Sequence, residues 1–423
     1  MTTLMTALVL SAVNLGLIWL LMAAPLGNRT IKIQKRIATD APRAWSLLGP
    51  GARFEQWNSD VLASRWSGGD PSRLELSYKH PDRHGRPTVR GFRTEVFEAE
   101  DRLERSIETS VTDDSALDIG HWKDFRECRA VRPVDGGALV TVSQTDRYRG
   151  AALLIYRYMC LRAEMSSLAR YIAGQPSLRR HPLTYPAIQT LLAILSTLML
   201  WPFFGLSERG LMISALLTIV ILLHEFGHMA AYRAFGHTHV RLMFIPLLGG
   251  IAIGSRPYAN RFEVATCALM GSGMSAFLVP ALTAADQSAR ALRLFGDISG
   301  PLMAFLLILG AFNLLNLLPM HRFDGGQVLR QVFRGRGSQM AASMLLTGVI
   351  LWIGWRIGVP PMGLMAALAV FTLMSLIGSA GPRPRDELAD LTPAERLLVG
   401  FGLFAAISIH GYAVIYACDR LFG

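Results

Sequence analysis

The hydrophobic positions of this chain fall into long blocks separated by polar stretches. A helix needs roughly 20 apolar residues, rising about 1.5 Å each, to cross a bilayer. Blocks that reach or approach this length are Leu4–Ala23, Tyr185–Phe204, Leu211–Tyr232, Val264–Ala284, Pro301–Leu318, Met340–Trp355, Pro361–Ser379 and Leu397–Ala417. The pattern predicts a polytopic α-helical membrane protein with about eight spans. The first block is long and lacks an early basic residue, so we expect a retained anchor and not a cleaved signal.

The segment between the first two blocks has a different pattern. It holds roughly 150 mainly polar residues, a usual size for one domain. Apolar and polar residues alternate with a period of two in short runs separated by turn residues, which predicts strands, and the segment ends in an amphipathic helix, Ala151–Ala173. Thr39 or Asp40 is a suitable N-cap for a short helix, Ala41–Leu48. The predicted strands are Ile31–Ile37, Val61–Trp66, Arg73–Lys79, Thr88–Ala99, Arg102–Val111, Trp122–Arg132 and Ala138–Tyr148.

Composition agrees with a membrane location. Of the 423 residues, 51% are hydrophobic, and the formal net charge is +11. Arginines concentrate in the loops 233–261, 322–336 and 383–396, which the positive-inside rule places in the cytoplasm. Counting spans backward makes residues 27–183 cytosolic and leaves the N-terminus outside, in a multi-pass protein of the cell (plasma or inner) membrane. The basic excess is explained by orientation and headgroup contact, so we expect no nucleic-acid partner.

The four cysteines, Cys128, Cys160, Cys267 and Cys418, show neither paired nor C-x-x-C spacing. They indicate no disulfide framework and no cysteine metal cluster, which suits a reducing compartment.

The third apolar block carries three ionisable residues. His224, Glu225 and His228 form an H-E-x-x-H string in the third block. Ionisable groups inside a span are costly and are by default functional. Residues four apart lie on one face of a helix, so both histidines can bind one ion, and Glu225 is placed to take a proton from water. The alternative is a helix with interfacial histidines.

Two histidines leave a catalytic zinc one protein ligand short. Asp324 follows the fifth block, precedes two glycines, and lies at a depth similar to that of His228, because the third and fifth spans run in the same direction. We expect Asp324 to be the third ligand. A surface turn is the alternative for Asp324, and His321 is the alternative ligand.

The strings H-E-F-G-H and N-L-L-P-M-H-R-F-D-G-G resemble the site-2 protease family of intramembrane zinc metalloproteases, whose pattern is H-E-x-x-H and, in a later helix, N-x-x-P-x-x-x-L-D-G. The resemblance covers about residues 185–330. It implies one zinc ion held by His224, His228 and Asp324, Glu225 as the general base, and Asn316 as a substrate or transition-state contact. Phe323 replaces the usual leucine.

Two further stretches fit this resemblance. Met243–Gly254 is apolar but too short to span, and it looks like the family's re-entrant β segment, whose edge can pair with an unwound substrate strand. Gly249 and Gly250 in this segment are therefore candidate substrate contacts; a plain interfacial loop is the alternative. Gly271–Ser275 occupies the place of the family's G-P-x-x-N motif without its proline and asparagine, and its small residues indicate close helix packing.

The cytosolic segment resembles the START-like helix-grip family, in which an antiparallel sheet wraps a last helix. The order of elements carries this resemblance, together with the stretch T-D-A-P-R-A-W (39–45) and Trp57. We expect four parts: an anchor (1–26), the START-like α+β domain (27–176), the zinc-binding membrane core (177–337) and additional C-terminal helices (338–423).

The expected function is hydrolysis of peptide bonds in single-span membrane proteins by a zinc metalloendopeptidase. Expected partners are a transmembrane protein substrate, the lipid bilayer, and a lipid or protein ligand of the cytosolic domain. A catalytically inactive scaffold or lipid-binding protein with a protease-like core is the alternative. A membrane di-iron hydroxylase is disfavoured, because such enzymes need several histidine boxes and this chain has one.

Overall fold

The chain folds as two compact units. The computed structural model describes residues 3–67, 70–98, 104–175, 186–245, 249–292, 299–321, 323–365, 368, 385 and 387–423. The sheet unit comprises Val13–Pro182 and Gly381–Glu387, and the helical unit comprises Met1–Ala12, Leu183–Ala380 and Leu388–Gly423. The polar segment between the first two apolar blocks therefore belongs to a body of its own. The boundary predicted at residues 176 and 177 lies outside the described residues.

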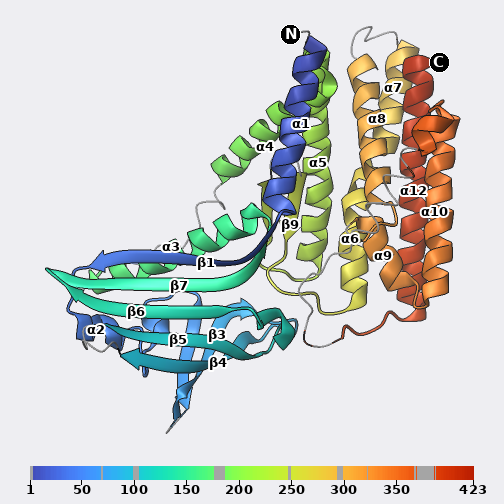
Figure 1. The fold of residues 1–423 in the computed structure, drawn as a ribbon. Helices are drawn as coiled ribbons and strands as arrows, with labels where there is room; N and C mark the ends of the chain where they lie inside the picture. Colours follow the sequence, from blue (N-terminus) through green and yellow to red (C-terminus); the bar gives the residue numbers. More distant parts are fainter. Residues whose placement is uncertain are drawn as a thin grey trace. The chain divides into compact units, whose positions relative to one another are not determined.

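The sheet unit is built on one seven-stranded antiparallel sheet in the order β1-β7-β6-β5-β4-β3-β2 (Figure 1). All seven predicted strands are present. The first begins earlier than predicted, because helix α1 (Thr3–Met22) runs almost directly into it. The sixth begins later, because Ile119–Trp122 forms a 3-10 helix. The strands are β1 (Pro25–Ile37), β2 (Val61–Ser67), β3 (Asp70–Pro81), β4 (Pro87–Glu98), β5 (Arg105–Asp114), β6 (Arg126–Val134) and β7 (Gly137–Arg149).

Helix α3 (Ala151–Ile172) packs on the β1 and β7 side of this sheet, and the short helix α2 (Ala41–Ser46), with Asp40 as its N-cap, contacts β6 and β7. The second half of α3 buries Leu161, Met165 and Leu168 in the core of the sheet unit. Each such side chain contributes about 1.5–3 kcal/mol on burial. An antiparallel sheet holding a C-terminal helix is the START-like helix-grip arrangement that the sequence predicts.

Six helices of the helical unit, among the described residues, are long and apolar enough to cross a membrane. They span Pro186–Phe204, Glu208–Ala234, Arg261–Ser288, Ser299–Asn316, Arg336–Arg356 and Pro393–Phe422. Of the two other predicted spans, the first corresponds to α1, and Pro361–Ser379 lies largely outside the described residues. Eight spans thus remain a prediction, while six long apolar helices are a feature of the structure.

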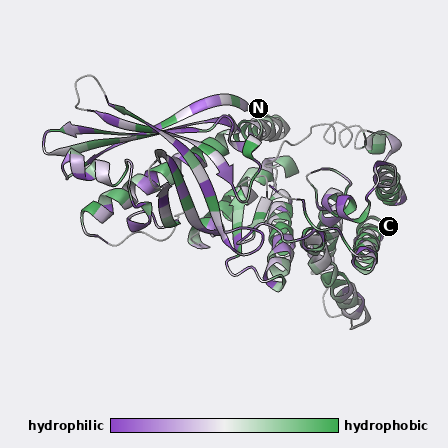
Figure 2. Ribbon diagram, turned by 90° about the horizontal axis from the view of Figure 1, so that it is seen from below, coloured by the Kyte–Doolittle hydropathy of each residue, from purple (hydrophilic) through white to green (hydrophobic). Residues whose placement is uncertain are grey.

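The outward faces of these helices carry large apolar side chains. Leu191, Leu345 and Phe401 are 63%, 71% and 68% exposed. In Figure 2 the helices are coloured mostly as hydrophobic, whereas the strands alternate between hydrophilic and hydrophobic positions. Exposed apolar surface of this extent is compatible with contact to a membrane or to another protein.

Six elements position the candidate site. Helix α5 (Glu208–Ala234) leads to a two-stranded antiparallel hairpin, β8 (Arg241–Ile245) and β9 (Gly249–Ile253), whose residues 246–248 lie outside the described residues. Helices α6 (Arg261–Ala276), α8 (Ser299–Asn316) and α9 (Asp324–Val332) follow. The described helices of this unit also include α4 (Pro186–Leu200), α7 (Leu278–Leu292), α10 (Arg336–Arg356) and α12 (Pro393–Phe422).

Candidate metal centre

Helix α5 presents both motif histidines on one face, as their spacing requires. The Nε2 atoms of His224 and His228 lie 3.1 Å apart. The two imidazole rings stand nearly perpendicular to each other, at 85°. Both nitrogens therefore point towards one shared position.

Asp324, the first residue of α9, brings a carboxylate to the same position. Its Oδ2 lies 3.0 Å from Nε2 of His224 and 3.4 Å from Nε2 of His228. The two following glycines explain how the backbone reaches this place. A Cβ on Gly325 would overlap the carbonyl of Leu317, and one on Gly326 would overlap the carbonyl of Met320. The D-G-G sequence is thus needed for close packing of α9 on the turn before it.

The other ring nitrogens show which tautomers the histidines adopt. Nδ1 of His228 lies 2.7 Å from the backbone carbonyl of Cys267, which only accepts hydrogen bonds. Nδ1 of His224 lies 2.8 Å from Oδ1 of Asn313, and the amide nitrogen of Asn313 donates to the carbonyl of Leu309. Both Nδ1 atoms therefore carry the proton, and both Nε2 atoms present lone pairs.

With both histidines neutral, three electron-pair donors converge. Oδ2 of Asp324 is buried and has no hydrogen-bond partner, although it lies close to both histidines. Such an arrangement is unfavourable unless a cation fills it. Tetrahedral zinc with bonds of about 2.0–2.1 Å requires ligand atoms about 3.3 Å apart, and the observed 3.0, 3.1 and 3.4 Å agree with this to within about 0.3 Å. The two imidazoles and one carboxylate fit zinc.

Glu225 lies beside this donor set and is tied to the hairpin. Its Oε2 accepts a hydrogen bond of 2.9 Å from the backbone N–H of Ala252 in β9. A ligand atom from each of His224, Glu225 and His228 lies within 4.8 Å of the others. Gly250 gives Glu225 its room, because a Cβ there would overlap the glutamate side chain. The carboxylate is therefore both close to the centre and oriented by a strand.

Helix α6 forms the wall behind the histidines. A Cβ on Gly271 would lie 2.6 Å from Nε2 of His228 and 2.7 Å from Nε2 of His224. Gly227 of α5 faces the backbone of Met270 and Gly271, so the two helices meet through glycines. The small residues at 271–275 provide close helix packing, as predicted, and this packing lies directly on the donor nitrogens.

The remaining predicted site residues are placed less centrally. Asn316 ends α8, and its amide donates to the carbonyl of Phe312 at 3.1 Å. Gly249 and Gly250 open β9, as predicted for a β segment here. His321 lies in the turn before α9 with an exposed side chain, so the geometry favours Asp324 over His321 as a ligand.

Sequence reasoning missed Asn313 and the Cys267 carbonyl, which hold the two histidines. Asn313 gave one usable signal: it is a polar residue inside an apolar helix, one turn before Asn316. A backbone carbonyl gives no signal in any sequence.

His237 follows the end of α5 and is buried. Its Nε2 lies 2.7 Å from Oε1 of Glu263, and its Nδ1 accepts the N–H of Ser255 at 2.9 Å. Arg256 adds an ion pair to Glu263 at 3.2 Å. This network fixes the chain directly after β9, so the hairpin is held both here and at Glu225.

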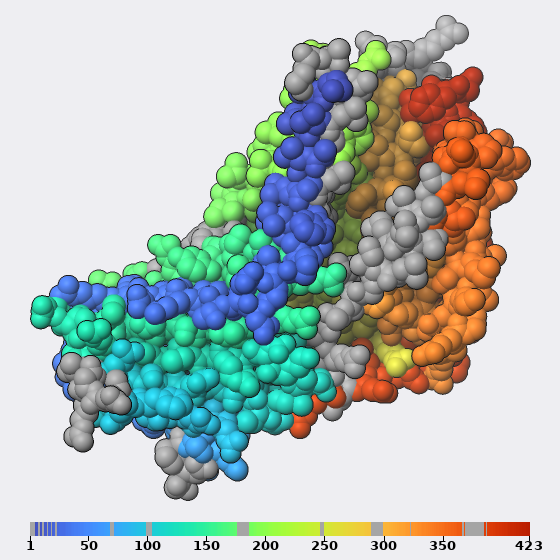
Figure 3. Space-filling view, in the orientation of Figure 1, coloured from blue at the N-terminus to red at the C-terminus, as the bar shows by residue number. Residues whose placement is uncertain are grey.

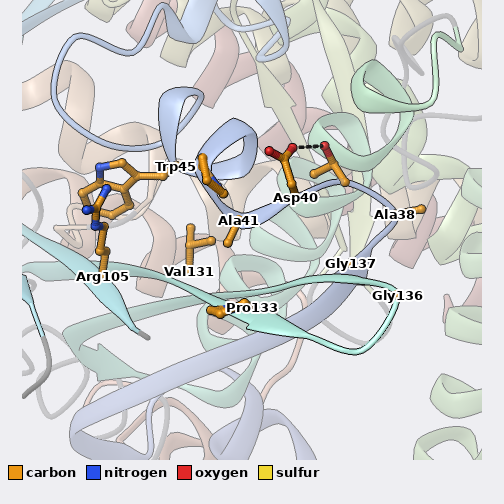
Figure 4. Close-up of a pocket in the computed structure, with 11 residues that line it drawn as sticks. Ala38, Asp40, Ala41, Trp45, Arg105, Val131, Pro133, Gly136 and Gly137 are labelled. Carbon is orange, nitrogen blue, oxygen red and sulfur yellow. Dashed lines mark hydrogen bonds between the residues drawn. The ribbon is translucent and has the colours of Figure 1, made fainter. Parts of the chain in front are cut away.

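A separate cavity of about 810 Å³ lies in the sheet unit (Figure 4). Its lining includes Trp45, Arg105, Val131 and Asp40, which contacts the hydroxyl of Thr39 at 3.4 Å. The lining residues offer no cluster of metal ligands or of catalytic groups. Among the described residues, the histidine and glutamate side chains that could together hold a metal ion lie in the helical unit.

Comparison with known proteins yields matches to solved structures alone. No protein-family model matches the chain, and no curated protein matches it. The chain is similar to a START superfamily protein from Mycobacterium smegmatis, with 15% identity and a TM-score of 0.24, over 35% of this chain and 95% of that one. It is also similar to Ara h 8.0201, with 9% identity and a TM-score of 0.27, over 35% and 100% of the two chains. A third similar structure, of a protein from Arthrobacter aurescens, has 10% identity and a TM-score of 0.28, over 36% and 91%. The helix-grip description of the sheet unit follows from its own strand order and from the position of α3.

Proposed function

We propose that this chain is an intramembrane zinc metalloprotease of the site-2 protease type, which hydrolyses peptide bonds of single-span membrane proteins. One observation carries the proposal. Two lone-pair imidazole nitrogens and a carboxylate oxygen converge at 3.0–3.4 Å within a unit of long apolar helices, and each imidazole is fixed through its other nitrogen. This arrangement fits a cation, and Glu225 stands next to it.

His224, His228 and Asp324 would hold the metal. Zinc, when bound, supplies a Lewis acid that polarises a carbonyl group and acidifies water. The Asn313 amide and the Cys267 carbonyl keep the imidazoles in the tautomer that can bind a metal, which is the usual role of such outer partners. The scaffold alternative gives no reason for two fixed tautomers that face an acidic side chain.

Glu225 would move the proton. Its Oε2 is engaged by the N–H of Ala252, so transfer falls to Oε1. Oε1 accepts one proton of the attacking water, while the water oxygen bonds to the carbonyl carbon of the substrate. The same carboxyl group then delivers that proton to the leaving nitrogen as the C–N bond breaks. Water is thereby added across the peptide bond with atoms and charge balanced.

The hairpin would present the substrate. In an antiparallel pair the N–H and C=O of one residue point to the same side, and alternate residues point the same way. Ala252 pairs with Leu242, yet its N–H bonds Glu225, so Ala252 and Gly250 direct their backbone groups away from β8. Glu225 occupies part of this edge, so an extended peptide that pairs with the remaining backbone groups would lie beside the general base. The substrate span must therefore unwind locally, because a helical peptide bond is shielded by its own hydrogen bonds.

The location follows from the same proposal. With six apolar helices and arginines in the loops named above, we place the chain in the cell membrane with the sheet unit in the cytosol. The sheet unit would then control access or bind a lipid or protein ligand.

Metal content and cleavage of matched variants test the proposal. We expect about one zinc per purified wild-type chain and per Glu225→Gln chain, with cleavage abolished in the latter. Asp324→Ala should lose the zinc, and the matched control His321→Ala should keep it. Zinc loss in His321→Ala but not in Asp324→Ala would overturn the ligand set. Full cleavage by Glu225→Gln would overturn the proton transfer, and wild-type protein with neither zinc nor cleavage would favour a scaffold.

A further inference from the structure

The first half of α3 is apolar and uncovered. Every residue from 151 to 160 is half-buried or exposed, whereas Leu161, Met165 and Leu168 in the second half are buried. Leu153, Ile155, Tyr156 and Tyr158 are 46%, 51%, 45% and 43% exposed. The sheet therefore covers only part of this helix.

Apolar residues also occupy the side of α3 that faces away from the sheet core. At 3.6 residues per turn, Leu153, Tyr156 and Cys160 lie on the side opposite Met165. Arg157 is the one charged residue from 151 to 161. A helix that is hydrophobic all round is normally buried in protein or in a membrane. The described residues of the sheet unit leave this half of the helix exposed, so it offers an apolar surface for contact.

The beginning of α3 lies next to the end of α1. The N–H of Gly150 donates to the carbonyl of Ala24 at 2.9 Å, and Pro25 pairs with Arg149 in the sheet. Helix α1 ends at Met22 and continues directly into β1, as Figures 1 and 3 show. If α1 enters the bilayer, as its length of 20 residues and its mainly apolar composition predict, the start of α3 lies at the bilayer surface.

The helix half carries two charged residues, and both are arginines, Arg157 and Arg162, while the nearest acidic residue on the helix is Glu164. Tyr156 and Tyr158 lie among them, and tyrosine is enriched at membrane interfaces. An apolar stripe flanked by arginines is the composition of helices that lie in the interface of anionic membranes.

We propose that the first half of α3, residues 151–162, is a lipid-binding surface that lies in the headgroup region of the bilayer and prefers anionic phospholipids. The surface would attach the sheet unit to the membrane at a second point besides α1. This attachment uses none of the groups around the metal centre, so it stands or falls independently of proteolysis.

Site-specific photo-crosslinking in the full chain tests this surface. The photoreactive amino acid p-benzoylphenylalanine is placed at Leu153 or at Tyr156, and the protein is reconstituted in nanodiscs of equal parts phosphatidylglycerol and phosphatidylcholine. His84 serves as the exposed control, because it lies in the turn between β3 and β4, at the sheet edge away from β1. Phe401 on α12 serves as the control for a lipid-facing span. After irradiation, mass spectrometry identifies each adduct.

We expect lipid adducts at 153 and 156 and none at 84. Phosphatidylglycerol should exceed phosphatidylcholine by about fivefold at 153 and 156 for each arginine engaged, whereas adducts at 401 should follow the bulk ratio. Changing Arg157 and Arg162 to Gln should remove the preference and retain the lipid adducts. Adduct yields at 153 and 156 equal to that at 84 would overturn the proposal. So would a covalent dimer as the main product, which would assign the surface to a second copy, or equal capture of both lipids regardless of the arginines.

Discussion

Substitution of Asn313 by Ala is the sharpest perturbation of the candidate metal centre that leaves the donor atoms themselves in place. The side chain of Asn313 is fully buried in α8, and its Oδ1 lies 2.8 Å from Nδ1 of His224. Alanine removes the acceptor and leaves the Nδ1–H without a partner. The imidazole can then move its proton to Nε2, which prevents metal binding.

The expected loss of zinc affinity in Asn313→Ala can be estimated in two independent ways. A buried donor left unsatisfied costs about 1–3 kcal/mol. Loss of a hydrogen bond behind a metal-binding histidine typically lowers metal affinity by about 10–100-fold. At about 1.4 kcal/mol per tenfold change, that factor corresponds to about 1.4–2.8 kcal/mol, so the two estimates overlap. We expect Asn313→Ala to bind zinc about 10–100-fold more weakly than the wild type.

The assay is zinc competition with a chelator of known affinity, on purified full-length protein in detergent. Asn316→Ala is the matched control, because Asn316 lies on the same helix but donates to the carbonyl of Phe312. We expect its zinc affinity to be unchanged. Asn313→Asp keeps an oxygen acceptor at the same place and should retain zinc. Equal zinc affinity in Asn313→Ala and the wild type, or a greater loss in Asn316→Ala, would refute the reasoning about the tautomer.

Two further predictions concern packing and pH. Gly271→Ala should lose zinc, because the added Cβ would lie 2.6 Å from Nε2 of His228. Gly273→Ala should keep zinc, because its Cβ would first meet the sulfur of Met270 at 3.4 Å. Equal metal content in the two variants would contradict this prediction. In the sheet unit, burial raises the pKa of Glu164 to about 7 despite its ion pair with Arg129 at 3.1 Å. The folded state then binds the proton of Glu164 more tightly than the unfolded state does. The contribution of Glu164 to the free energy of unfolding is therefore fully present below about pH 4.5, and it declines by at most about 3 kcal/mol as pH rises to about 7. Hydrogen exchange of α3 between pH 5 and 8 should show this decline in the wild type and a flatter profile in Glu164→Gln; matching profiles would remove Glu164 as the cause.

Local patterns account for most of the fold. The alternation that predicts a strand at Ala138–Tyr148 depends on neighbouring residues alone, and β7 follows it closely. Two features of the sheet unit differ from what these patterns predict. Trp122 was predicted to open a strand, but the residue lies in a 3-10 turn. Its indole N–H donates to Asp114 at 3.1 Å. Arg385 belongs to the sheet unit and forms an ion pair with Asp113 at 3.0 Å. These two residues are far apart in the chain, so no local sequence pattern predicts their contact.

The candidate site divides in the same way. The spacing of His224 and His228 predicts that they share a helix face, because one helix decides it. The prediction that Asp324 lies near the histidines came from comparing the depths of two spans, and its carboxylate lies 3.0 Å from Nε2 of His224. Asn313 and the Cys267 carbonyl depend on which helices pack against α5 and at what rotation. Periodicity within one helix does not contain that information, so the groups that set the tautomers appear only in three dimensions.

Intramembrane proteolysis by this chain is tested most directly by comparing membrane-protein fragments in cells that contain the wild type and cells that contain Glu225→Gln. Both forms should hold zinc and reach the membrane in equal amounts. Quantitative mass spectrometry should find single-span proteins cut within their apolar segments in the wild-type cells and intact in the variant cells. Identical fragment profiles at equal expression, with zinc bound in both, would contradict the proposed activity.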